Sequence, residues 1–86
     1  MKILGEYCLR NVMDENLLIR TGDGSSDVIY TLGETGAFIW SHITAEATAA
    51  SIAAAMCEEY DVTEAQAVED VKKFLDVLVE EKLIEL

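Results

Sequence analysis

The chain has 86 residues, of which 51% are hydrophobic and none is Pro, and its six Lys and Arg stand against seventeen Asp and Glu for a net charge of −11. A chain of this length forms one domain around a shared core and leaves little material for a deep catalytic cleft. Its apolar content excludes a wholly disordered chain, so we expect residues 1–86 to fold as a single domain.

Negative charge is concentrated in the second part of the chain. Residues 1–33 carry three basic and five acidic side chains, whereas residues 34–86 carry three basic and twelve acidic ones. Such a surface repels the phosphates of nucleic acids and anionic lipids, and it suits a partner that bears Lys and Arg. A contribution to solubility alone is an equally good explanation.

The sequence contains no signal for export or membrane insertion. Residues 1–16 lack an apolar run of signal-peptide length, and no run anywhere in the chain has the length of a membrane span. We therefore expect a cytoplasmic protein that does not bind membranes, with Cys8 and Cys57 as buried, reduced thiols. Because His42 is the only histidine, we expect no metal site, and no motif calls for a cofactor.

The first part of the chain predicts three strands. Short runs rich in β-branched and aromatic residues predict strands over 7–12, 17–21 and 28–32. Met13-Asp14-Glu15-Asn16 predicts the turn of a hairpin between the first two strands, and residues 22–27 predict a looser loop before the third.

Two helices are expected next. Gly33 and Glu34 mark the start of a short helix whose core face includes Trp40 and extends to Ile43. Thr48 caps a second helix, rich in Ala, whose apolar ridge repeats at every fourth residue: Ile52, Met56 and Tyr60. The Ala residues beside this ridge allow close packing against another helix.

The third predicted helix is the longest. Thr63-Glu64-Ala65-Gln66 has the form of a capping box, in which the Thr63 hydroxyl and the Gln66 side chain each accept from the other residue's backbone N–H. The apolar stripe of this helix is wider than one neighbour requires, and Lys82-Leu83-Ile84 ends it. Glu69 and Lys73 lie one turn apart and predict an ion pair.

Three strands followed by three helices predict an α+β, winged-helix-like fold, with an N-terminal three-stranded antiparallel sheet followed by a three-helix bundle. Winged-helix proteins often bind DNA, but the helix after Thr63 carries net negative charge and would repel phosphate, so we expect no nucleic-acid partner. Acyl carrier proteins are also small and acidic, but no Ser of this chain stands in the Asp-Ser-Leu context that carries their prosthetic group.

No set of residues predicts an enzyme. His42 is the only imidazole base for a Ser or Cys nucleophile, and it has no defined route to either cysteine. Residues 22–26 lack the ending of a phosphate-binding loop, and the acids Glu58, Glu59 and Asp61 lack the spacing of a calcium loop. The class that remains is a binding module.

The strand predicted over 28–32 is the feature that a binding module could use. It contains neither a charge nor Pro, the two devices by which proteins usually protect a sheet edge from pairing. If this strand is central, the observation is trivial. If it lies at the edge, its outer N–H and C=O groups can pair with an extended peptide while the last helix supplies side-chain pockets.

Several stretches resemble the PqqD family, named for coenzyme PQQ synthesis protein D. They are YCLRNV at 7–12, LGETGAFIW at 32–40, EEYDV at the end of the Ala-rich helix, and AVEDVKKFLDVLVEEKLI in the last helix. The most telling element is Leu32 followed by Gly36, Ile39 and Trp40. Gly33 departs from the family, which often has a polar capping residue such as Asn there.

The resemblance implies a non-enzymatic peptide chaperone, also called a RiPP recognition element. Such proteins hold the leader of a ribosomally made precursor peptide and present it to a modifying enzyme, often a radical SAM protein. In the family the leader pairs with the third strand beside the third helix, which implies binding here by Val28, Ile29, Tyr30, Thr31, Leu32, Val68, Val71, Lys72 and Leu75. PQQ biosynthesis and a homodimer both stay open, and a winged-helix adaptor or transcriptional regulator is the alternative.

Overall fold

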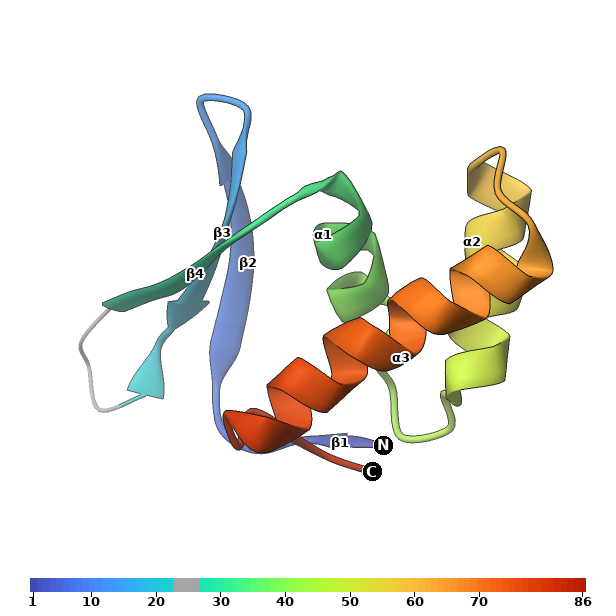
Figure 1. Cartoon of the computed structure of the whole chain (residues 1–86). Coiled ribbons are helices and arrows are strands. Elements are labelled where there is room, and N and C mark those ends of the chain that lie inside the picture. Colours follow the sequence, from blue (N-terminus) through green and yellow to red (C-terminus); the bar gives the residue numbers. More distant parts are fainter. Residues whose placement is uncertain (23–26) are drawn as a thin grey trace. The chain divides into compact units, whose positions relative to one another are not determined.

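The structure is a computed structural model of the chain and describes residues 1–22 and 27–86 (Figure 1). The chain divides into a sheet unit, Gly5–Ser41, and a helical unit, Met1–Leu4 with His42–Leu86. Three paired antiparallel strands followed by three helices confirm the predicted α+β fold. The loop predicted over 22–27 falls largely on residues 23–26, which lie outside the described residues.

A hairpin with a two-residue turn begins the sheet unit. It joins β2 (Tyr7–Val12) to β3 (Glu15–Arg20), with Val12 paired to Glu15. Met13 and Asp14 both have positive φ, 52° and 66°, and a turn of this kind matches the twist of the strands it joins. The predicted turn over 13–16 is therefore too long, and β3 begins two residues before the predicted Leu17.

The sheet is completed by β4 (Asp27–Leu32), which pairs antiparallel with β3 to give the order β2-β3-β4. On the central strand, Leu18 is fully buried, and its cross-strand neighbours are Leu9 and Tyr30. Cross-strand neighbours share a face of the sheet, so these three side chains form one apolar layer.

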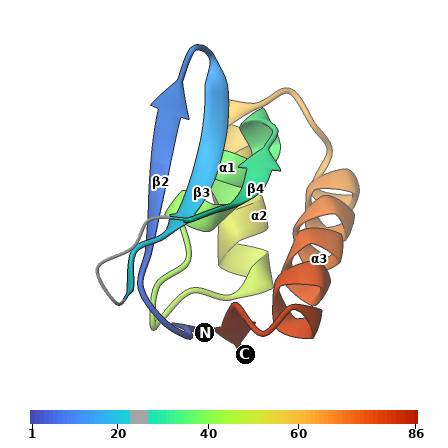
Figure 2. The same ribbon diagram turned by 90° about the vertical axis from the view of Figure 1, so that its left-hand side faces the viewer.

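Helix α1 (Glu34–Ser41) lies on one side of this sheet (Figure 2). It begins as predicted, since the N–H of Ala37 donates to the carbonyl of Gly33. It ends at Ser41, whose hydroxyl donates to the carbonyl of Phe38 at 2.8 Å and competes there with a further helical N–H. Ile43, which was predicted on this helix, lies beyond its end but is buried.

In the helical unit, α2 (Ala49–Glu59) packs against α3 (Glu64–Glu80), as Figure 1 shows. The residues buried along both helices are apolar and recur at helical spacing: Ile52, Ala53 and Met56 on α2, and Ala67, Val71, Leu75 and Leu78 on α3. On the outer surface of α3, Lys73 Nζ lies 3.2 Å from Glu69 Oε1, which confirms the predicted ion pair.

The caps of the two long helices differ. At α2, Thr48 caps the helix as predicted and forms a full capping box with Ser51, with N–H to Oγ distances of 3.0 and 2.9 Å. At α3, Thr63 accepts from the N–H of Gln66, but the Gln66 side chain donates to Asp70 at 2.9 Å. The predicted box is half formed, because the Asp70 carboxylate one turn away draws the Gln66 amide along the helix.

Helix α3 stops at Glu80, two residues before the Lys82-Leu83-Ile84 that is predicted to end it. Lys82 has φ 62°, and the N–H groups of Lys82 and Leu83 donate to the carbonyls of Val79 and Leu78, the pattern of a Schellman motif. The chain then forms β5 (Ile84–Glu85), which pairs antiparallel with β1 (Lys2–Ile3). The two ends of the chain therefore lie side by side (Figure 1).

Candidate functional site

Strand β4 lies at an edge of its sheet. Among the described residues its pairing partner is β3 alone, so one row of its backbone N–H and C=O groups points away from the sheet. From the sequence, this strand could lie either in the centre or at the edge of the sheet. The strand order β2-β3-β4 shows that it lies at the edge. The opposite edge, β2, carries the charged residue Arg10, whereas β4 carries a charge only at its first residue, Asp27.

The side chains of the predicted β4 residues differ in how far they are exposed to solvent. Tyr30 lies opposite Leu18 and shares its buried face, whereas Val28 and Thr31 lie on the other face of the sheet by register. Val28 is 57% exposed and Thr31 is also exposed, while the half-buried members are Ile29, Tyr30 and Leu32. A ligand at this edge would therefore meet backbone polar groups with exposed side chains beside them on the outer face.

The pairing of β4 with β3 is interrupted at one residue. Leu18 lies opposite Tyr30, but the next residue of β3, Ile19, lies opposite Val28. Ile29 is thus an extra residue with no counterpart in β3, which makes a β-bulge. Nothing in the sequence predicts this bulge, because it depends on the register between two strands and Ile29 itself has ordinary strand propensity.

The four predicted residues of α3 fall into two pairs by burial. Val71 and Leu75 are 0% and 3% exposed, and both belong to the core. Val68 is half-buried, and Lys72, one turn further along, is exposed. Val68 and Lys72 therefore provide the accessible surface, and the two buried residues hold the helix in place beneath it.

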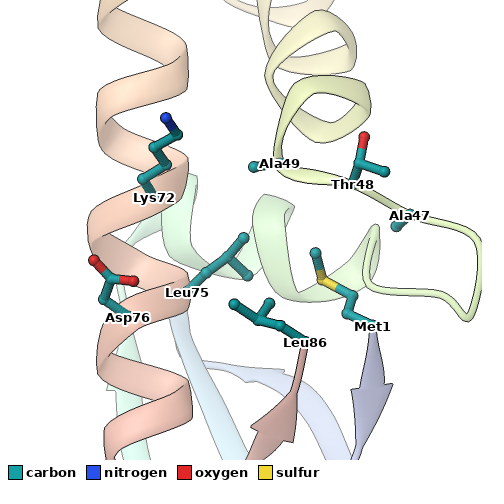
Figure 3. A pocket seen from close by; sticks show the side chains of 8 residues that line it. All are labelled: Met1, Ala47, Thr48, Ala49, Lys72, Leu75, Asp76 and Leu86. Atoms are coloured by element: carbon teal, nitrogen blue, oxygen red, sulfur yellow. The ribbon is translucent and has the colours of Figure 1, made fainter.

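A pocket opens beside Lys72 within the helical unit (Figure 3). It has a volume of about 530 Å³, and its lining comes from the chain ends, the start of α2 and the middle of α3: Met1, Ala47, Thr48, Ala49, Lys72, Leu75, Asp76 and Leu86. Met1, Leu75 and Leu86 face the space, while Lys72 and Asp76 stand along α3 at its rim. The sequence could not predict this pocket, because its walls are far apart along the chain.

The structure offers two separate features for binding: backbone hydrogen-bonding groups along β4 in the sheet unit, and in the helical unit an apolar pocket with Lys72 and Asp76 at its rim. Within residues 1–22 and 27–86, no group of three His, Cys, Asp or Glu side chains could hold a metal ion. Cys8 and Cys57 are free, half-buried thiols. In the same part of the chain, no helix is both long and apolar enough to cross a membrane.

Comparisons with known proteins give one family and one solved structure. The family described as Coenzyme PQQ synthesis protein D (PqqD) matches residues 20–84, which include all of β4 and α3. The structure of TbiB1 in complex with the TbiA(beta) leader peptide is similar to this chain, with 28% identity and a TM-score of 0.74. That similarity covers 99% of this chain and 95% of the other. No curated protein matches.

Proposed function

The chain belongs to the PqqD family, and from this we propose that it is a peptide-binding adaptor for the leader of a ribosomally made precursor peptide. The edge position of β4 is the observation that carries the proposal. The similarity to TbiB1, whose structure contains a leader peptide, supports it. In this proposal residues 1–86 act together as one peptide-binding domain and catalyse no reaction.

The leader adds to the sheet as a further strand beside β4. Main-chain hydrogen bonds along Val28, Ile29, Tyr30, Thr31 and Leu32 supply affinity that depends little on the sequence of the peptide, and alternate side chains supply specificity. Val28 and Thr31 meet leader side chains on the outer face of the sheet, because these two residues are exposed there.

Residues of α3 contribute the remaining contacts. Val68 and Lys72 touch the leader directly, and the Lys72 ammonium pairs with an acidic group of the peptide. Val71 and Leu75 act from beneath, because they are buried and a ligand reaches little of either side chain. Replacing either buried residue should therefore lower stability together with affinity.

The adaptor presents the bound leader to a modifying enzyme in the cytoplasm. A radical SAM protein is the enzyme that the family resemblance suggests, and PQQ biosynthesis is one pathway in which it would act. The net charge of −11 suits an enzyme whose docking face bears Lys and Arg. Co-purification of this chain with the enzyme encoded beside it, and loss of the complex at high salt, would test this step.

Proline substitutions in β4 test the binding mode. Successive residues of a strand direct their N–H groups to opposite edges, so either Thr31 or Leu32 directs its N–H outward. Pro at the outward residue leaves the pairing with β3 intact and removes a donor from the free edge. We expect one of Thr31→Pro and Leu32→Pro to keep its circular dichroism spectrum and bind the leader at least tenfold more weakly, about 1.4 kcal/mol.

Strand β2 supplies matched controls for this experiment. Arg10 and Asn11 lie opposite Leu17 and Asn16, the same residues of β3 that Thr31 and Leu32 face from the other side. Folded Arg10→Pro and Asn11→Pro variants should bind the leader as tightly as the unaltered chain does. Binding is measured by isothermal titration calorimetry, with leader peptides taken from precursor genes that lie near the gene of this chain. If Thr31→Pro and Leu32→Pro both fold and bind a proven leader unchanged, strand addition at β4 is wrong.

A further inference from the structure

The register of β4 divides the strand into two segments. Tyr30, Thr31 and Leu32 lie opposite Leu18, Leu17 and Asn16 without interruption. Asp27 and Val28 lie opposite Arg20 and Ile19 in a register shifted by one residue. Ile29 is the extra residue between the segments, and a bulge at this place bends the strand and increases its twist.

The bulge changes the free edge of β4 as well as the paired one. In a regular antiparallel strand, every second residue presents its N–H and C=O to a given edge. One extra residue breaks this alternation, so the outward groups of 27–28 and those of 30–32 no longer belong to one regular ladder. A straight added strand can stay in register with one segment but not with both.

We propose that the Ile29 bulge ends the ladder between β4 and the leader, so that the peptide pairs along Tyr30–Leu32 and leaves the sheet at Ile29. This inference rests on the proposed function. It adds that the Ile29 bulge determines how long a stretch of the leader pairs with β4. The ligand class that follows is a peptide with a short extended stretch of about three residues, the length of the regular segment. Beyond that stretch the peptide turns away from the strand.

Two observations favour Tyr30–Leu32 over Asp27–Val28 as the paired segment. The first segment packs on β3 next to Leu18, which is fully buried, so its backbone is held in a fixed position before the peptide arrives. The second segment has two residues and begins with the carboxylate of Asp27. A charge at a sheet edge opposes pairing, so bulge and carboxylate both protect that end of β4.

Amide hydrogen exchange of the full chain tests the boundary. Exchange rates of the ¹⁵N-labelled protein are measured by NMR in two samples. One contains the protein without peptide, and the other contains the protein saturated with a leader that calorimetry has shown to bind. Each segment contains an outward amide, because neighbouring residues alternate. We expect exchange to slow at least tenfold at the outward amide of Thr31 or Leu32, and less than twofold at both Asp27 and Val28.

The possible outcomes separate this inference from the proposed function. Equal protection at Val28 or Asp27 would overturn the boundary while strand addition stands. No added protection from Asp27 to Leu32 with saturating leader would overturn strand addition itself. Deleting Ile29 gives an independent test, since a folded deletion variant should regain one regular ladder and extend protection to Asp27 and Val28. Protection that still stops at the residue before Thr31 in that variant would show that the bulge is not the cause.

Discussion

At the scale of single residues, Trp40 shows how the sheet unit is held together. It is 7% exposed, and its ring meets that of Tyr7 edge-on, with 5.7 Å between centroids and 85° between planes. Aromatic pairs with this geometry contribute about 0.5–1.5 kcal/mol beyond the area they bury. The burial of Trp40 confirms the prediction that it lies on the core face of its helix.

Removing this side chain should unfold the protein or nearly so. Trp40→Ala is expected to lower the free energy of unfolding by about 3–5 kcal/mol, a large share of what a small domain has. Trp40→Phe keeps an aromatic ring against Tyr7 and should lose clearly less. Urea titration followed by circular dichroism measures both variants. Unchanged unfolding of Trp40→Ala together with lost leader binding would instead place Trp40 in the binding site.

Lys82 has a backbone conformation that is unfavourable for a residue with a side chain. Its φ of 62° is the left-handed conformation that Gly adopts without penalty. Lys82→Gly should stabilise the protein by about 1 kcal/mol and raise the melting temperature by about 4–8 °C. Lys82→Ala is the control, because it removes the charge and keeps Cβ, and it should give no such rise. An equal rise of the melting temperature in both variants would mean that loss of the Lys82 charge, and not the backbone conformation, causes the stabilisation.

At the scale of elements, α3 carries two adjacent cations in different settings. Lys73 is paired with Glu69 on the outer surface, whereas Lys72 stands at the rim of the pocket beside Asp76. Both are exposed, so replacing either should change stability by less than about 0.5 kcal/mol. Their effects on binding can therefore be compared without a folding defect.

Reversing the charge at each position should separate the two lysines. Lys72→Glu is expected to weaken leader binding about fivefold, or roughly 1 kcal/mol, because it replaces an attractive charge in the proposed site with a repulsive one. Lys73→Glu should bind as the unaltered chain does. Calorimetric titration at low salt gives the largest difference. Equal losses in the two variants would mean that only the overall charge matters and that Lys72 has no specific contact.

At the scale of the whole molecule, negative charge dominates both units. The helical unit has four basic and eleven acidic side chains, and the sheet unit has two basic and six acidic ones. The acidity is therefore not confined to one element. Phosphate contacts supply nearly all non-specific affinity for nucleic acid, and this chain has few cations to make them.

We expect no binding to DNA even under favourable conditions. A mobility-shift experiment with mixed-sequence duplex at low salt gives a weak binder its best chance, because electrostatic attraction is then least screened. The chain should leave the duplex unshifted at micromolar concentration. Micromolar binding that weakens steeply as salt rises would favour the alternative of a winged-helix regulator over a peptide adaptor.

The sequence by itself determined the local structure. Thr48 and Thr63 marked the starts of α2 and α3, and the 28–32 run marked all of β4 except Asp27. Caps and periodic apolar residues act through hydrogen bonds and contacts a few residues apart, so these signals are complete within a short window. The resemblance to the PqqD family was carried by other short stretches, at 7–12, 32–40, 58–62 and 67–84, and the match over residues 20–84 confirmed it.

Tertiary structure alone decided which parts of these elements a ligand can reach. The edge position of β4, its bulge at Ile29 and the pairing of β1 with β5 each depend on where a distant segment lies. Burial divided the predicted residues of α3 in the same way, with Val71 and Leu75 in the core and Lys72 at the surface. Apolar side chains on one helix look alike in sequence, and only the neighbours that pack against them distinguish core from binding surface.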